Sequence, residues 1–209
     1  MSQPVLYTTL EHEGKAEFTE KKSVFIAHAK PIESEEDALT YIKKIKSEYM
    51  DARHNVWAYM MNGEIVARYS DDGEPQGTAG VPVLDTIRKS GVTDAVVVVT
   101  RYFGGILLGA GGLVRAYLHA AKLGLEAAHI ITYEQYVELS LDCTYSDYQR
   151  YLAELPRFGV ITDDTVFTDR VKMLFSVKES IAPELLLRIR EMSGGKDEPT
   201  VRGKRFDYR

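Results

Sequence analysis

The residues best suited to chemistry occur in three short segments, 53–57, 70–80 and 101–115. The first contains Arg53 beside a histidine, the second contains closely spaced carboxylates, and the third begins with Arg101 and continues into a glycine-rich stretch. Arginine pairs with phosphate and carboxylate groups, and glycine lets a ligand approach the backbone closely. This combination indicates a site for an anion.

The acidic segment and the histidine also permit a catalytic interpretation. Asp71, Asp72 and Glu74 could hold magnesium or form an acid–base pair, with His54 as a general base. Carboxylates that are solvated in a turn, or paired with arginines, are the simpler interpretation, and a lone histidine at a strand start is more often structural. These four residues are weak catalytic candidates, and the balance favours a protein that is not an enzyme.

The glycine-rich stretch does not match the common nucleotide-binding loops. Five glycines lie between Gly104 and Gly112, but the Gly-Lys-Ser/Thr ending of a P-loop is missing. A Gly-x-Gly-x-x-Gly motif with its distant acidic partner is missing as well. ATP hydrolysis and dinucleotide redox chemistry are therefore poorly supported, and no cofactor is expected.

Metal chemistry has equally little support in the sequence. The single cysteine, Cys143, excludes a thiolate zinc site and a disulfide framework. No metal-ligand spacing connects the histidines at positions 12, 28, 119 and 129. We therefore expect no metal site.

Hydrophobic periodicity and turn residues predict the elements that must position the three segments. The apolar run from Ala95 is typical of a buried strand, and Thr78 can cap the helix that follows the acidic loop. The predicted elements are a strand at 23–29, a helix capped by Ser34, a hairpin of 55–60 and 64–69 around Asn62-Gly63, a helix at 79–90, a strand at 95–101 and a helix at 113–128.

The order of these elements gathers the three segments at one end of a sheet, which we call the near edge. The hairpin begins there beside Arg53 and ends there after Tyr69; the next helix runs away, and the following strand returns to it at Arg101. Two helix N-termini, suited to phosphate or carboxylate, lie at the same end. The binding residues expected at the near edge are Arg53, His54, Trp57, Asp72, Glu74, Gln76, Gly77, Thr78, Arg101, Tyr102, Gly104, Gly105, Gly109, Gly111, Gly112 and Arg115.

Members of this set have different expected roles. The residues expected to contact phosphate or an acidic partner are Arg53, Arg101 and Arg115. Backbone amides would come from 77–80 and 109–112, although tight turns explain the five glycines of 104–112 equally well. Trp57 or Tyr102 would stack on a base if the partner is RNA.

After about residue 131 the pattern of elements starts again. Strand, helix, two strands, helix and strand follow one another, which is the βαββαβ order of a ferredoxin-like domain. The predicted ranges are 136–143, 145–158, 160–167, 171–177, 182–192 and a strand within 198–208. We therefore expect an α+β protein with two domains, 1–134 and 135–209.

Composition limits the class of protein. The hydrophobic share of 44% and the charged share of 27% are ordinary for a globular chain, and the net charge of −5 argues against a surface that is basic throughout. The first ten residues do not form a signal peptide, and the longest strongly apolar stretch, 95–99, is far shorter than the ~20 residues of a membrane span. We expect a cytoplasmic protein.

Four segments resemble the signature of the IMPACT family. They are Ala52–Tyr59, Ser70–Gly80, Val99–Gly105 and Leu108–Tyr117. The C-terminal part resembles the smaller domain of the bacterial, YigZ-like two-domain members, so the resemblance extends over nearly the whole chain.

The resemblance implies a fold and a setting. The N-terminal domain should be similar to the second domain of ribosomal protein five of the small subunit, and the C-terminal domain to the last domain of elongation factor G. Eukaryotic relatives regulate translation by competing for the activator of a stress-responsive kinase. Nucleic-acid or ribosome association of bacterial members is an analogy from fold.

Three functions remain open at the level of sequence. The preferred one is a binding or regulatory protein that contacts RNA, the ribosome or a translation factor through the near edge. The second is an enzyme acting on a phosphorylated or carboxylated small molecule at the glycine-rich stretch. The third is a regulator that contacts only other proteins.

Overall fold

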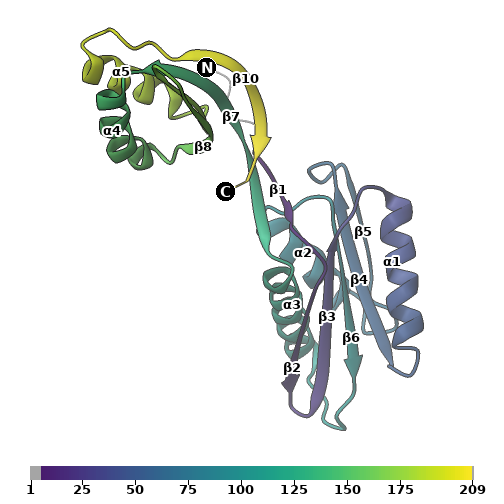
Figure 1. Cartoon of the computed structure of the whole chain (residues 1–209). Coiled ribbons are helices and arrows are strands. Elements are labelled where there is room, and N and C mark those ends of the chain that lie inside the picture. The colour runs from purple at the N-terminus through teal and green to yellow at the C-terminus, as the bar shows by residue number, and fades with distance from the viewer. Residues whose placement is uncertain (1–5, 209) are drawn as a thin grey trace. The chain divides into compact units, whose positions relative to one another are not determined.

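The computed structural model describes residues 6–208, which divide into two compact units (Figure 1). The first unit is Tyr7–Thr132, and the second comprises Leu6 together with the described residues from Tyr133 onward. The elements are β1 Tyr7–Leu10, β2 Gly14–Glu20, β3 Ser23–Pro31, α1 Glu35–Glu48, β4 His54–Met61, β5 Val66–Ser70, α2 Gly80–Lys89, β6 Ala95–Tyr102, α3 Ala110–Ala127, β7 Ile130–Cys143, α4 Tyr145–Glu154, a 3-10 turn Leu155–Phe158, β8 Ile161–Phe167, β9 Val171–Lys178, α5 Ala182–Ser193 and β10 Thr200–Asp207.

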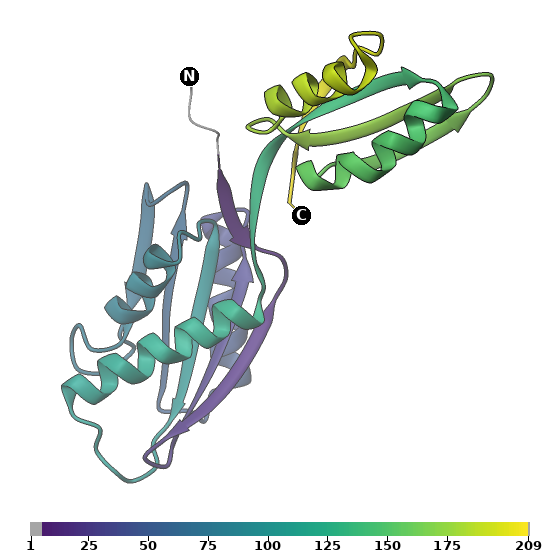
Figure 2. The ribbon, with the colours of Figure 1, turned by 90° about the vertical axis from the view of Figure 1, so that its left-hand side faces the viewer.

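The first unit is a sheet covered by helices on both faces. Its strand order is β2-β3-β6-β4-β5, with antiparallel neighbours throughout. Helices α2 and α3 cover one face and α1 covers the other (Figures 1 and 2). Alternate residues of β6 point to opposite faces of the sheet. Val97 and Val99 pack toward α2 and α3, while Val96 and Val98 pack toward α1.

Two features of the first unit differ from the sequence prediction. The structure has strands β1 and β2 before β3, where no strand was predicted. The β2–β3 turn places Lys21 and Lys22 at positive φ, a conformation that glycine or asparagine usually signals. The second strand of the Asn-Gly hairpin begins at Val66, two residues later than predicted, because left-handed backbone continues through Glu64.

The second unit has the element order β7, α4, β8, β9, α5, β10. Strand β7 pairs with both β9 and β10, and β9 pairs with β8, each time antiparallel. Both helices share one core with the sheet, in which Cys143 is fully buried. Burial raises the pKa of its thiol to about 11, and the charge of Asp197 adds to the shift.

The whole chain is thus an α+β protein with two antiparallel sheets and, among residues 6–208, five α-helices. None of the helices in this range is both long enough and apolar enough to span a bilayer.

Candidate anion-binding site

Strand pairing brings the three polar segments together at the near edge. His54, the first residue of β4, lies opposite Arg101 near the end of β6. Strand β5 ends at Ser70 and leads through the acidic loop to α2, while β6 leads through the glycine-rich loop to α3. The topology therefore assembles the edge in the way that the order of elements predicts.

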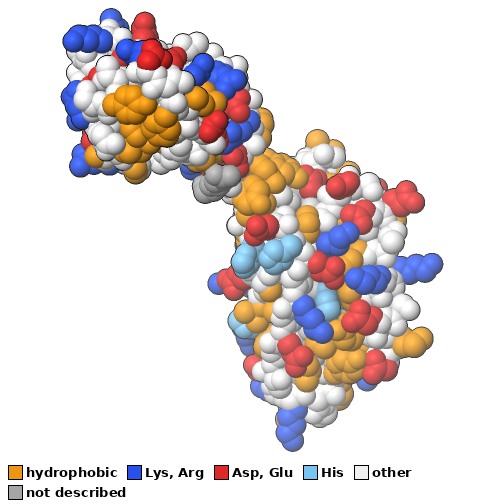
Figure 3. All heavy atoms as spheres, viewed as in Figure 1, with side chains coloured by type: hydrophobic (Ala, Val, Ile, Leu, Met, Phe, Trp, Pro, Cys, Tyr) orange, Lys and Arg blue, Asp and Glu red, His pale blue; other side chains and the backbone are white. Residues whose placement is uncertain are grey.

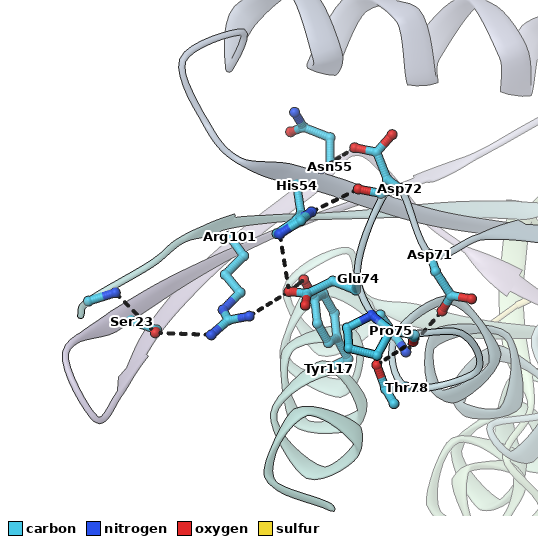
Figure 4. Close-up of polar contacts among 12 residues, drawn as sticks. Ser23, His54, Asn55, Asp71, Asp72, Glu74, Pro75, Thr78, Arg101 and Tyr117 are labelled. Carbon is cyan, nitrogen blue, oxygen red and sulfur yellow. Dashed lines mark hydrogen bonds and ion pairs between the residues drawn. The ribbon is translucent and has the colours of Figure 1, made fainter. Parts of the chain in front are cut away.

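Glu74 lies at the centre of a buried polar cluster (Figure 4). Its Oε1 accepts hydrogen bonds from Arg101 Nη1 at 2.6 Å and from the Tyr117 hydroxyl at 2.8 Å. The side chains of Glu74 and Arg101 are only 4% and 7% exposed. Glu74 is thus a buried partner of Arg101 rather than a solvated turn residue, and burial, followed by the Glu74 charge, raises the pKa of Tyr117.

His54 is held between two carboxylate-bearing residues. Its Nδ1 lies 2.8 Å from the Asp72 carbonyl oxygen, so Nδ1 carries the proton in the neutral ring. Its Nε2 then faces Glu74 Oε1 at 4.0 Å. The Asp72 carboxylate pairs with the Lys46 ammonium group at 2.5 Å and accepts a hydrogen bond from the backbone N–H of Asn55 at 2.6 Å. Asp72 therefore fixes the loop against α1 and β4.

Asp71 caps helix α2. Its carboxylate accepts hydrogen bonds from the amides of Gly77 at 2.9 Å, Ala79 at 3.1 Å and Gly80 at 2.8 Å. The expected Thr78 cap is wrong, because the Thr78 hydroxyl donates to the Pro75 carbonyl instead. The N-terminus of α2 thus already holds a carboxylate of the chain.

The N-terminus of α3 is different, because no side chain among residues 6–208 caps it. The helix starts after Gly109, whose carbonyl accepts the Leu113 amide as the first helical hydrogen bond. The earlier amides of the helix, including those of Gly111 and Gly112, have no partner within it. The positive end of this helix dipole is therefore available to an anion.

A cavity of about 370 Å³ lies beside this helix end. Arg53, His54, Glu74 and Arg101 form its polar wall, while the apolar wall includes Phe103, Leu107 and Leu108. Arg53 is exposed, and its side chain makes no ion pair or hydrogen bond with any residue in the described range 6–208. Arg101 Nε is buried and without a hydrogen-bond partner among the described residues.

Several predicted site residues lie away from this cavity. On β4, Trp57 stacks on Tyr59 at 5.8 Å and packs on the α1 side of the sheet. Tyr102 alternates with Arg101 along β6, and its hydroxyl donates to Asp51. Both rings therefore lie on the opposite face of the sheet from the Arg101 side chain, and their stacking on a base stays a prediction.

Four other predicted residues also do not line this cavity. Arg115 is exposed on α3 and borders a separate depression with Lys21 and His119. A side chain at Gly104 would meet the backbone of Lys22 at 2.0 Å, so glycine is needed here for the two backbone segments to pack closely. Gln76 and Gly105 are exposed in the two loops.

The predicted set of binding residues leaves out the apolar wall of the cavity. Phe103 is 42% exposed and lies against the Arg101 guanidinium at 5.6 Å, and Leu107 is 84% exposed. Exposed apolar residues next to an arginine in a glycine-rich loop were the signal that could have identified this wall. Ser23 was also missed; its hydroxyl accepts the Gly104 amide at 3.2 Å.

Family models match both parts of the chain. The Impact N-terminal domain matches residues 21–125, which include the whole cavity, and the Domain of unknown function (DUF1949) matches residues 141–196. A solved structure described as "Crystal structure of an hypothetical protein" covers 95% of this chain and is itself covered to 98%, with 27% identity and a TM-score of 0.59.

Curated relatives agree with these matches. IMPACT family member YvyE of Bacillus subtilis is 33% identical over 193 residues, which are 92% of this chain and 89% of the relative. An IMPACT family member of Haemophilus influenzae is 35% identical, with 84% and 87% covered. The Protein IMPACT homolog of Dictyostelium discoideum is 35% identical over 66% of this chain and 38% of its own length. This chain therefore belongs to the IMPACT family.

Proposed function

We propose that this protein is a regulatory binding protein of the translation apparatus, and that its partner places an anionic group in the cavity beside α3. The supporting observation is that an uncapped helix N-terminus and two arginines, Arg53 and Arg101, border one cavity. The translation setting comes from membership of the IMPACT family, whose relatives include proteins named IMPACT in vertebrates.

The charge of the cavity favours an anion. Glu74 neutralises one of the two arginines, which leaves a net positive charge that Arg53 carries. The end of α3 adds the equivalent of about +0.5 charge. A phosphate of RNA, or an acidic group of a ribosomal protein or translation factor, would complement this charge.

RNA is the partner that the apolar wall supports best. Phe103 presents a partly exposed ring at the cavity, next to the arginine that would lie near a phosphate. Stacking of a base on an aromatic ring contributes about 1–3 kcal/mol to single-strand binding. Phe103 thus takes the role that the sequence had predicted for Trp57 or Tyr102.

Binding to purified ribosomal subunits and to total RNA, measured over a series of salt concentrations, tests the proposal. Arg53→Ala is the informative variant, because Arg53 is exposed and its side chain has no hydrogen bond or ion pair to the part of the chain that the structure describes. Loss of one phosphate contact should weaken binding and reduce the slope of log affinity against log salt by roughly 0.7–0.9. Phe103→Ala should weaken binding with little change in slope.

Arg68→Ala is the matched control. Arg68 is an exposed arginine of β5 whose side chain donates to the neighbouring Ala67 carbonyl. Equal affinities and equal slopes for wild type, Arg53→Ala and Arg68→Ala would refute the site. Binding to ribosomes that survives nuclease treatment, and that Arg53→Ala still weakens, would identify an acidic protein partner instead of RNA.

The cavity volume supports a second function, recognition of a phosphorylated or carboxylated small molecule. About 370 Å³ is within the range of small-molecule sites, and His54 Nε2 lies at the cavity wall, 4.0 Å from Glu74 Oε1, where acid–base chemistry would need a proton carrier. Thermal-shift measurements with phosphomonoesters and dicarboxylates test this alternative. Stabilisation that Arg53→Ala removes and Arg68→Ala retains would favour it over RNA.

A further inference from the structure

Glu11, His12 and His129 form an exposed cluster in the first unit, outside the cavity. The ligand atoms of these three side chains all lie within 4.8 Å of one another. The two imidazole rings are 4.9 Å apart between centroids and tilted by 45°. Figure 3 shows histidine side chains gathered on the exposed surface of this unit. Residues so far apart in the chain give no spacing signal, so the fold alone brings the cluster together.

Backbone contacts hold the two contributing segments in place. The Glu11 amide donates to the His129 carbonyl at 2.8 Å, and the His12 amide donates to the Ala128 carbonyl at 3.3 Å. A side chain at Gly14 would meet the Ala128 backbone nitrogen at 2.3 Å, so the segments touch without side chains between them. The cluster therefore rests on a rigid junction, and the ordering cost of bringing its ligands together is small.

The hydrogen bonds of the side chains prepare them for a cation. His12 Nδ1 lies 3.0 Å from the Glu13 carbonyl oxygen, so Nδ1 carries the proton and Nε2 presents its lone pair. His129 Nδ1 lies 3.3 Å from Glu11 Oε2. Two ligands about 2.0–2.1 Å from a tetrahedral zinc ion are separated by roughly 3.3–3.4 Å. A metal ion can therefore replace the proton between His129 and Glu11 with little movement.

We propose that Glu11, His12 and His129 bind one divalent transition-metal ion of the zinc class. Two imidazoles and one carboxylate suit Zn²⁺, Co²⁺ or Ni²⁺, whereas Mg²⁺ and Ca²⁺ prefer oxygen ligands. The Glu11 and His129 side chains are 38% and 66% exposed, so water completes the coordination. The ion would fasten the segment after β1 to the end of α3, and so stabilise the first unit.

Titration of untagged, metal-depleted full-length protein with Zn²⁺ tests this site. We expect one ion per chain by calorimetry and a Co²⁺ complex with the visible absorption of low-symmetry coordination. His12→Ala and His129→Asn should each weaken Zn²⁺ binding by at least about tenfold. Asparagine is chosen at position 129 because His129 has a φ of +55°, which asparagine tolerates.

His119→Ala is the control, since His119 is an exposed histidine of α3 that lies outside the cluster. It should bind Zn²⁺ like wild type. Zn²⁺ should also raise the unfolding temperature of wild type and of His119→Ala, but not that of the His12→Ala/His129→Asn double variant. Wild-type affinity in the double variant, or no uptake of Zn²⁺ by the wild-type chain, would overturn the proposal.

Discussion

Glu74 and Arg101 determine the charge of the cavity at the scale of single residues. Both are buried, and Arg101 Nη1 pairs with the Glu74 carboxylate at 2.6 Å. Because a buried ion that loses its partner is left uncompensated, Glu74→Gln should destabilise the protein by about 3–5 kcal/mol in urea unfolding. The exposed pair of Glu64 with Arg88 is the control, and Glu64→Gln should cost at most about 1 kcal/mol.

A double variant distinguishes the cost of leaving one buried charge unpaired from the cost of losing the Glu74–Arg101 pair itself. Glu74→Gln together with Arg101→Met removes both charges, so it should be less destabilising than the two single substitutions added together. A Glu74→Gln protein as stable as Glu64→Gln would show that the pair is not buried in solution.

His28 gives a prediction for pH. It is 4% exposed on β3, and its Nε2 is buried without a partner among the described residues. Burial, and then the charge of Lys15, lowers the pKa of His28 below its ordinary value of 6.5. The folded protein therefore binds this proton less readily than the unfolded chain, so the stability is complete above pH 6.5 and falls as pH decreases toward the lowered pKa.

Unfolding temperatures measured from pH 8 to pH 5 test the His28 prediction. The wild-type value should fall in the acidic part of the range, and His28→Gln should remove part of this fall, whatever its stability at neutral pH. Parallel profiles for the two proteins would assign the acid sensitivity to other groups.

At the scale of elements, α2 depends on a cap that lies outside the helix. The Asp71 carboxylate accepts hydrogen bonds from three backbone amides at the start of α2. Two of these amides belong to the turn that precedes the helix. Asp71→Ala should therefore cost about 1–2 kcal/mol, and Asp71→Asn less, because an amide oxygen can still accept. Loss of protection of the Gly80 amide in hydrogen exchange would locate the effect at this helix end.

Thr78 provides the comparison for Asp71. Its hydroxyl donates to the Pro75 carbonyl within the loop, so Thr78→Val removes one hydrogen bond and leaves the cap intact. Protection of the Gly80 amide should persist in this variant. The same loss of protection in Thr78→Val and Asp71→Ala would contradict the assignment of the cap to Asp71.

Elements with strong local signals could be predicted from the sequence, and those without could not. The valine run of β6 and the Asn-Gly turn after β4 lie where their patterns indicate. Strand β2 was missed because Lys21 and Lys22 form a turn with residues that rarely take positive φ. The order of the strands predicts that the three polar segments meet at the near edge. It does not predict which group each carboxylate pairs with, because that depends on the positions of the side chains.

At the scale of the whole molecule, the two units have separate cores. Phe175 is fully buried in the core of the second unit, and Trp57, the single tryptophan of the chain, lies in the first. Phe175→Ala should cost about 3–5 kcal/mol by leaving a cavity. Circular dichroism should show the second unit unfolding at least about 10 °C lower, while the transition reported by Trp57 fluorescence stays in place.

Val97→Ala provides the reciprocal measurement, since Val97 is buried in the first unit between the sheet and helices α2 and α3. It should lower the Trp57 transition and leave the second unit unaffected. Equal shifts of both transitions in either variant would mean that the units unfold as one cooperative body.

The position of β6 in the first sheet determines how that sheet can be completed during synthesis. Strands β2 and β3 form one hairpin and β4 and β5 another, and β6 lies between them although it is made last. Each hairpin therefore leaves the ribosome with an unpaired inner edge, at β3 and at β4, that only β6 can satisfy. Until residue 102 has emerged, both edges are open to pairing with other chains, so this interval is when the nascent protein is most prone to aggregate.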